Sequence, residues 1–232
     1  MNSQRDSRVV TLPSVGTTGQ RATSLLASHR VLRNTYLLLA ATLLMSAATA
    51  GLAMALNLGR PHPLLVLAGM IGLLFWVEAA RNSAWGLAAV FSFTGFVGLV
   101  TGPVVQAYVR FLPNGGNVVI TALGGTAAIF VGLSAYALVS RRDFSKLGSM
   151  LTAGAIILLV ASVANIFLHI TGMSLVISAM AMVIFSGFML YDTGRIIDGG
   201  ETNYIRATVA LYLDIYNVFM SLLNLLGSSN RN

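Results

Sequence analysis

The chain has 232 residues, of which 56% are hydrophobic and only 9% are charged, with a formal net charge of +7 and no cysteine. A soluble domain of this length would have too little charge to cover its surface, and the lack of cysteine excludes disulfides, thiolate catalysis and cysteine-based metal sites. The composition predicts an integral membrane protein.

The first 28 residues are polar, rich in Ser, Thr and Arg, and without apolar periodicity. We expect residues 1–28 to form a flexible cytoplasmic tail and residues 29–232 to form the membrane domain. A cleaved signal peptide is the alternative, because Ala48-Thr49-Ala50 resembles a small-residue cleavage site. The apolar run continues past that site to Leu58, which favours a membrane span.

Seven apolar runs follow, each about as long as the 17–25 residues that a helix needs to cross a ~30 Å hydrocarbon core. The predicted spans are Tyr36–Leu58, Leu64–Ala80, Trp85–Thr101, Val118–Val139, Ser149–Ile170, Met173–Tyr191 and Ala207–Leu226. None of them shows the alternating pattern of a membrane barrel. The fold class is therefore an all-α membrane protein with seven transmembrane helices in one domain.

Basic residues are unevenly divided between the two ends of these spans. If the N-terminus is cytoplasmic, the cytoplasmic segments hold nearly all of the Lys and Arg, and the opposite side holds only Arg60, Arg110 and Arg231. Cytoplasmic loops of membrane proteins carry an excess of Lys and Arg. The positive charge thus indicates a cytoplasmic N-terminus and an outer C-terminus, and we expect no nucleic-acid partner.

Small residues recur at helical spacing in two spans. Gly95, Gly98 and Gly102 share a face of the third span, and Gly124, Ala128 and Gly132 share a face of the fourth. Helices in lipid associate through such faces, because small side chains let two backbones come close. Both sets are predicted to be packing positions.

The last span differs from the others because it carries a polar stripe. Six residues at spacings of three and four form it: Ala207, Ala210, Asp214, Asn217, Ser221 and Asn224. Such a stripe must face protein or water, since polar side chains are costly in lipid. We expect this helix to lie in the middle of the bundle.

Asp192 and Asp214 are the main candidates for a functional site. An aspartate at the centre of a spanning helix costs about 2.5–3.5 kcal/mol on insertion scales. At 1.5 Å per residue the two carboxylates differ in depth by about 10 Å, so they could meet. At ~4 Å their repulsion would be about 4 kcal/mol, and the pair would share a proton as a pH sensor or cation site. Alternatively, Asp192 reaches water and Asp214 is a structural residue capped by Asn217 or by Tyr side chains.

Other polar residues are weaker candidates. Glu78 and Arg81, three residues apart, are expected to pair on the helix surface, or Arg81 reaches across to neutralise Asp192. Asn165 belongs to a short polar stripe in the fifth span. No phosphate loop, zinc pattern or nucleophile elbow occurs, so we predict no catalytic residue, no metal site, no cofactor and no enzymatic activity.

Several short motifs in order along the chain resemble the Bax inhibitor (TMBIM) family. They are Phe93-Thr94-Gly95, Arg142-Asp143-Phe144-Ser145, Leu147-Gly148, Asn165-Ile166-Phe167, Leu190-Tyr191-Asp192 and Leu211-Tyr212-Leu213-Asp214. The segment Gly199–Thr208 resembles the YccA-like branch of this family, whose members are bacterial inner-membrane proteins that associate with the membrane protease FtsH and restrain it.

The resemblance implies a last helix wrapped by the other six, a location in the bacterial inner membrane, and FtsH as a partner. It also implies an alternative function, a pH-dependent leak of calcium or another cation, in which Asp192 and Asp214 sense protons. In family members of that kind a basic residue on the second helix latches the pair. Glu78 stands at that position here, and Arg81, one turn further on, is the candidate substitute.

Overall fold

The computed structural model describes residues 16–140, 142–170 and 172–229, with side chains from residue 29 onward. Over these ranges the chain forms helices and no strands. The helices are α1 Gly16–Ala55, α2 Pro63–Ala80, α3 Trp85–Phe111, α4 Gly115–Ser140, α5 Leu147–Leu168, α6 Met173–Ile197 and α7 Tyr204–Ser229. Each one contains a segment that is long and apolar enough to cross a membrane, which confirms the predicted fold class.

Two helices run further than the sequence predicted. α3 continues through Pro103 to Phe111, and α6 continues past Tyr191 to Ile197. A proline removes only one backbone donor, and helices in a membrane tolerate this when neighbouring helices surround them. In α6 the extension ends in Arg195 and Asp198, polar residues that suit the end of a span. Asp192 is therefore an internal residue of α6 rather than its last.

The first helix begins earlier than expected. α1 starts at Gly16, so residues 16–28, which we predicted to be part of a tail without regular structure, continue the helix in the structure. Once a span has formed, each added residue gains one backbone hydrogen bond, and this stretch contains no proline to stop the helix. Residues 1–15 of the predicted tail lie outside the described residues.

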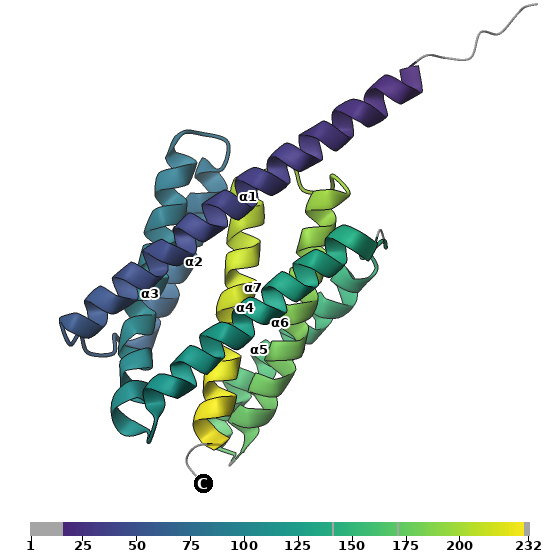
Figure 1. Cartoon of the computed structure of the whole chain (residues 1–232). Coiled ribbons are helices and arrows are strands. Elements are labelled where there is room, and N and C mark those ends of the chain that lie inside the picture. The colour runs from purple at the N-terminus through teal and green to yellow at the C-terminus, as the bar shows by residue number, and fades with distance from the viewer. Residues whose placement is uncertain (1–15, 141, 171, 230–232) are drawn as a thin grey trace, which may run out of the picture.

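α7 occupies the interior of the bundle. It packs against α1, α2, α3, α4 and α6, and none of its residues from Ala207 to Ser228 is exposed. Figure 1 shows it running between α3 on one side and α6 on the other. The expectation that all six other helices wrap it is wrong in one respect: α5 packs on α6 and, over the described residues, not on α7.

Aromatic and branched side chains fill the core between α3 and α7. Phe93 and Tyr212 meet edge to face with 5.9 Å between ring centroids, and both are nearly inaccessible. Such a pair is worth about 0.5–1.5 kcal/mol beyond the burial of its area. The Tyr212 hydroxyl bonds to Ser46 of α1, whose own hydroxyl donates to the Thr94 carbonyl at 2.8 Å. This contact joins α1, α3 and α7.

The two predicted small-residue faces behave differently. On α3, a side chain at Gly98 would collide with Ser46 and Thr49, and one at Gly102 would lie 2.6 Å from the Ala50 carbonyl oxygen. This confirms close packing of α3 on α1. On α4 the prediction is wrong, because Gly124 and Gly132 are exposed and no atom lies within 4 Å of where their side chains would be. α4 packs through the opposite face, with Val118, Ala122 and Thr126.

Candidate functional site

The polar stripe of α7 faces protein, as predicted. Asp214 is 5% exposed, and none of the other five residues of the stripe is exposed to the outside of the bundle. Ionisable residues inside a membrane usually face the bundle interior and mark functional positions. Asp214 is therefore the first residue of the candidate site.

Asp192 reaches the same point from α6. α6 and α7 are joined by the short segment 198–203 and pack along each other, so residues near the adjoining ends of the two helices are neighbours. The carboxyl groups of Asp192 and Asp214 are close enough to share a hydrogen bond. The structure thus brings the two predicted acids together.

The surroundings of the pair are short of donors. Oδ2 of Asp214 is buried and has no hydrogen-bond partner in the part of the chain that the structure describes, and the same holds for the neighbouring Thr193 hydroxyl. A carboxyl group can donate a hydrogen bond to another only when it carries a proton. Two facing carboxyl groups can therefore hold a proton or a cation between them.

Charged residues extend from the pair to the end of the bundle. Arg195 contacts Asp192, with 3.7 Å between Nη1 and Oδ1, and also Glu201, with 3.7 Å between Nη2 and Oε2. Arg206 lies next to Glu201, with 3.9 Å between Nε and Oε2. The side chains of Asp192 and Glu201 are mostly buried, so Arg195 neutralises two acids that have little access to water.

The same chain of charges ends on α2. Nε of Arg206 lies 3.5 Å from Oε2 of Glu78, and Glu78 also pairs with Arg81. Acids and bases alternate along it in the order Asp192, Arg195, Glu201, Arg206, Glu78 and Arg81. We call these six residues the charge network. It links α6, the 198–203 segment, α7 and α2.

The predicted latch residue lies at the outer end of this network. Arg81 pairs with Glu78, as the first alternative expected, and no ion pair among the described residues joins it to Asp192. The ion-pair partner of Asp192 is Arg195, because Arg195 follows Asp192 by three residues and lies on the same side of α6. The sequence carried this signal in the spacing of Asp192 and Arg195, but we did not use it.

Asn217 and Asn165 are not part of the pair's surroundings. The Asn217 amide donates to the Leu213 carbonyl one turn earlier in α7, with 2.8 Å between the atoms, and so does not cap Asp214. Asn165 lies near the end of α5, whereas Asp192 lies near the end of α6, and the two helices run in opposite directions. The buried Oδ1 of Asn165 has no partner among the described residues.

Asn203 fixes the start of α7 next to the charge network. Its side chain accepts from the Ile205 amide at 2.9 Å, and its own amide donates to the Arg81 carbonyl at 3.1 Å and to Asn82 Oδ1 at 2.9 Å. An asparagine in this position satisfies amides at the helix start that would otherwise have no partner. It therefore ties the α2–α3 turn to α7.

Outside the spans, one further acid is held by its own turn. Asp143 lies between α4 and α5, and hydrogen bonds from the Ser145 side chain and backbone amide lower the pKa of its carboxyl group. Within the described residues, no group of three or more His, Cys, Asp and Glu side chains could hold a metal ion.

Comparison with known proteins decides the family. A family model described as "Inhibitor of apoptosis-promoting Bax1" matches residues 28–231, nearly the whole membrane domain. The chain belongs to the Bax inhibitor family. This confirms the resemblance that the short motifs indicated.

Similar proteins occur in several bacteria. The chain is 49% identical over 209 residues to a protein of Escherichia coli K12 named "Modulator of FtsH protease YccA", covering 90% of this chain and 94% of that one. A second E. coli strain has an equally similar protein named "Inner membrane protein YccA". An uncharacterized protein of Pseudomonas aeruginosa is 47% identical over 85% of this chain and 88% of its own. None of these names describes an enzyme.

Proposed function

We propose that this protein is an inner-membrane modulator of the FtsH protease. The observation that carries the proposal is the identity of 49% with the modulator from E. coli, which extends over 90% of the chain. The segment Gly199–Thr208 is the one that resembles the YccA-like branch of the family. It contributes Glu201 and Arg206 to the charge network. The role is one of binding and restraint rather than catalysis.

The direct test is a degradation assay in cells. The full-length chain would be produced in E. coli lacking its own YccA, and the half-life of a membrane-protein substrate of FtsH would be followed after protein synthesis is stopped. We expect the half-life to lengthen and FtsH to co-purify with the chain. An unchanged half-life together with no co-purification would contradict the proposal.

The N-terminal segment is the proposed point of engagement. It precedes the membrane domain, and a protease that processes proteins from an end could grasp it. Deleting residues 2–28 should therefore weaken co-purification with FtsH and shorten the substrate half-life again, while the remaining domain stays in the membrane. Equal inhibition by the truncated and full-length chains would show that the segment is irrelevant.

The buried acidic pair favours a second function, a pH-dependent leak of calcium or another cation. Asp214, on the polar stripe of α7, and Asp192 of α6 lie next to each other, and an intramembrane acid pair is a typical feature of ion and proton pathways. This function would operate beside the modulation of FtsH and would use a different part of the molecule.

Calcium flux into proteoliposomes, measured between pH 5 and pH 8, tests the leak. We expect flux that depends on pH, and loss or displacement of that dependence in Asp192→Asn and in Asp214→Asn. The double variant should then add little, because either substitution already removes the interaction between the two charges. Flux equal to that of protein-free vesicles, or strictly additive effects of the two substitutions, would contradict the proposal.

A further inference from the structure

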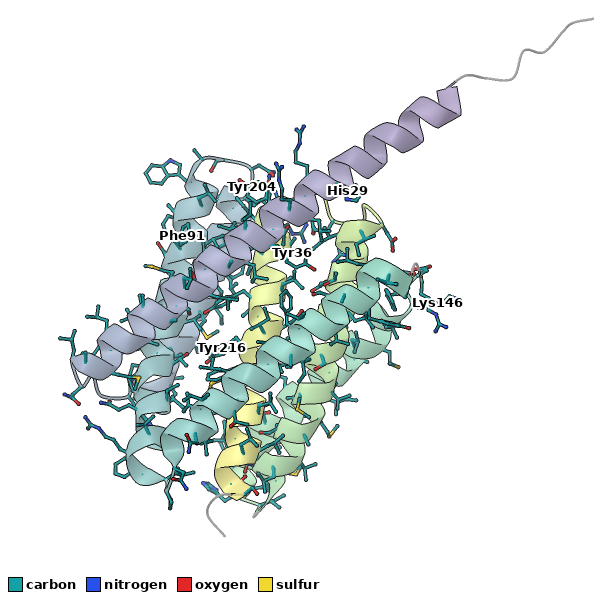
Figure 2. The ribbon with its side chains drawn as sticks, viewed as in Figure 1. His29, Tyr36, Phe91, Lys146, Tyr204 and Tyr216 are labelled. Carbon is teal, nitrogen blue, oxygen red and sulfur yellow. The ribbon has the colours of Figure 1, made fainter. Side chains whose placement is uncertain are left out.

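A groove of about 400 Å³ lies between α1 and α4 on the outer surface of the bundle. The backbones of these two helices do not pack on each other over the described residues. Tyr36 of α1 and Phe130 of α4 bridge them, with their rings edge to face and 5.8 Å between centroids. Figure 2 shows Tyr36 in the space between the two ribbons.

The walls of the groove are apolar. α1 contributes Ala40 and Leu43, and α4 contributes Val131, Ser134 and Ala135. From Tyr36 to Leu43 the groove follows α1 for about 10 Å, at 1.5 Å per residue. One leaflet of the hydrocarbon core is about 15 Å deep. The groove is therefore shorter than one leaflet, which is too short for a membrane-spanning helix and suits the upper part of an acyl chain.

Two hydroxyl groups in the groove have no hydrogen-bond partner in the described part of the chain. Ser134 is 7% exposed, and both its hydroxyl and that of Tyr36 are buried without a hydrogen bond to any described residue. Buried hydroxyl groups normally have a partner. The ester carbonyls at the head of a phospholipid's acyl chains are acceptors of the kind that these hydroxyl groups lack.

Basic residues surround one end of the groove. His29 and Arg33 are exposed and precede Tyr36 by seven and three residues, on the α1 stripe that continues through Ala40 and Leu43. Arg142 and Lys146, also exposed, follow the end of α4. Figure 2 shows His29 and Lys146 toward the same end of the bundle.

This basic end is suited to an anion. Neither Arg33 nor Arg142 forms an ion pair with a described residue, and the nearby Asp143 carboxylate accepts from the Ser145 amide at 2.8 Å. Basic pockets at the edge of a membrane bind the phosphate of anionic lipids. We propose that the α1–α4 groove binds one anionic phospholipid, with an acyl chain along the groove and its phosphate between Arg33 and Arg142.

Lipid retention by the purified full-length protein tests the site. Native mass spectrometry would count bound lipid after equilibration with equal amounts of phosphatidylglycerol and phosphatidylethanolamine that carry identical acyl chains. We expect one retained phosphatidylglycerol. Ala40→Trp and Ala135→Trp fill the groove from its two walls, and each should lower retention about tenfold. Because the two substitutions are on different helices, a folding failure of one leaves the other as a test.

The matched control for the groove is Ala153→Trp, which places the same side chain at an exposed position of α5, a helix that packs on neither α1 nor α4 over the described residues. It should retain lipid as the unaltered protein does.

The basic residues are tested by two further substitutions. Arg33→Gln and Arg142→Gln should each reduce the preference for phosphatidylglycerol roughly fivefold. Arg60→Gln, at the other end of the bundle, should leave it unchanged.

Three results would overturn the proposal. Equal retention of the two lipids by the unaltered protein would remove the anionic preference. Equal loss of lipid in Ala153→Trp would show that the retained molecules only surround the bundle. Normal lipid retention in both groove-filling variants would show that the retained lipid does not occupy the groove.

Discussion

At the residue scale, Asp192 lies between a like charge and an opposite one. Asp214 approaches it from the bundle interior, and the Arg195 guanidinium lies 3.7 Å away on the other side. Arg195 also neutralises Glu201, whose side chain is only 12% exposed. A single arginine therefore contacts two mostly buried acids, and its loss would leave Asp192 without a close counter-charge while Glu201 keeps Arg206.

Arg195→Gln is expected to lower stability by about 0.5–1 kcal/mol, because the arginine is itself 38% exposed and solvent screens part of the interaction. Thermal unfolding in detergent at neutral pH should show this as a fall of roughly 2–4 °C per kcal/mol. Adding Asp192→Asn should recover part of the loss, since one uncompensated acid is then removed. A double variant less stable than Arg195→Gln would contradict this account of the network.

At the element scale, two glycine-containing faces with the same spacing have opposite surroundings. Gly98 of α3 is pressed against α1, and Gly124 of α4 has open space around it. The spacing alone predicted packing for both. Whether a small-residue face meets a helix depends on where the neighbouring helices lie, which is a property of the whole bundle and is not encoded in the local pattern.

This difference provides a matched pair of substitutions. Gly98→Val should destabilise the protein by about 1–3 kcal/mol or more, because the added methyl groups require α1 to move away from α3. Gly124→Val should change stability by less than about 0.5 kcal/mol, since its side chain enters open space. Thermal unfolding of both variants in one detergent measures the contrast. Equal unfolding temperatures would contradict the close packing of α1 on α3.

Other parts of the fold could be predicted from the sequence for physical reasons. A span is a long apolar run, and a polar stripe on a helix must be buried, so the seven helices and the interior position of α7 could be predicted. The meeting of Asp192 and Asp214 could be anticipated from their depths. The partner of Asp192 differs from the candidate that the sequence analysis named: Arg81 pairs with Glu78, and Arg195, three residues after Asp192 on α6, contacts Asp192.

At the scale of the whole molecule, the described cations concentrate at one end. In Figure 1 the turns 81–84, 142–146 and 198–203 lie at the end from which α1 enters, and they or the adjoining helix ends carry Arg81, Arg142, Lys146, Arg195 and Arg206. The opposite end carries Arg60 and Arg110 among the described residues. The excess of basic residues predicts that the first end is cytoplasmic.

Single cysteines can test this orientation cleanly, because the natural chain has none. Thr202→Cys and Gly59→Cys place an exposed thiol in a turn at opposite ends of the bundle. In intact cells a membrane-impermeant maleimide should label Gly59→Cys after the outer membrane is made permeable, and should label Thr202→Cys only when the inner membrane is also opened. The reverse pattern would place the N-terminus outside.

The interior position of α7 also constrains how the protein is made. Translation delivers α7 after the other six helices, yet α7 supplies the side chains on which α1, α3, α4 and α6 converge. Until it arrives, those helices surround a space that includes Ser46, Asp192 and other polar groups whose final partners are still missing. Insertion of the earlier spans therefore cannot complete the core. A ribosome stalled before Tyr204 would leave an incomplete bundle in the membrane, open to recognition as unfinished protein.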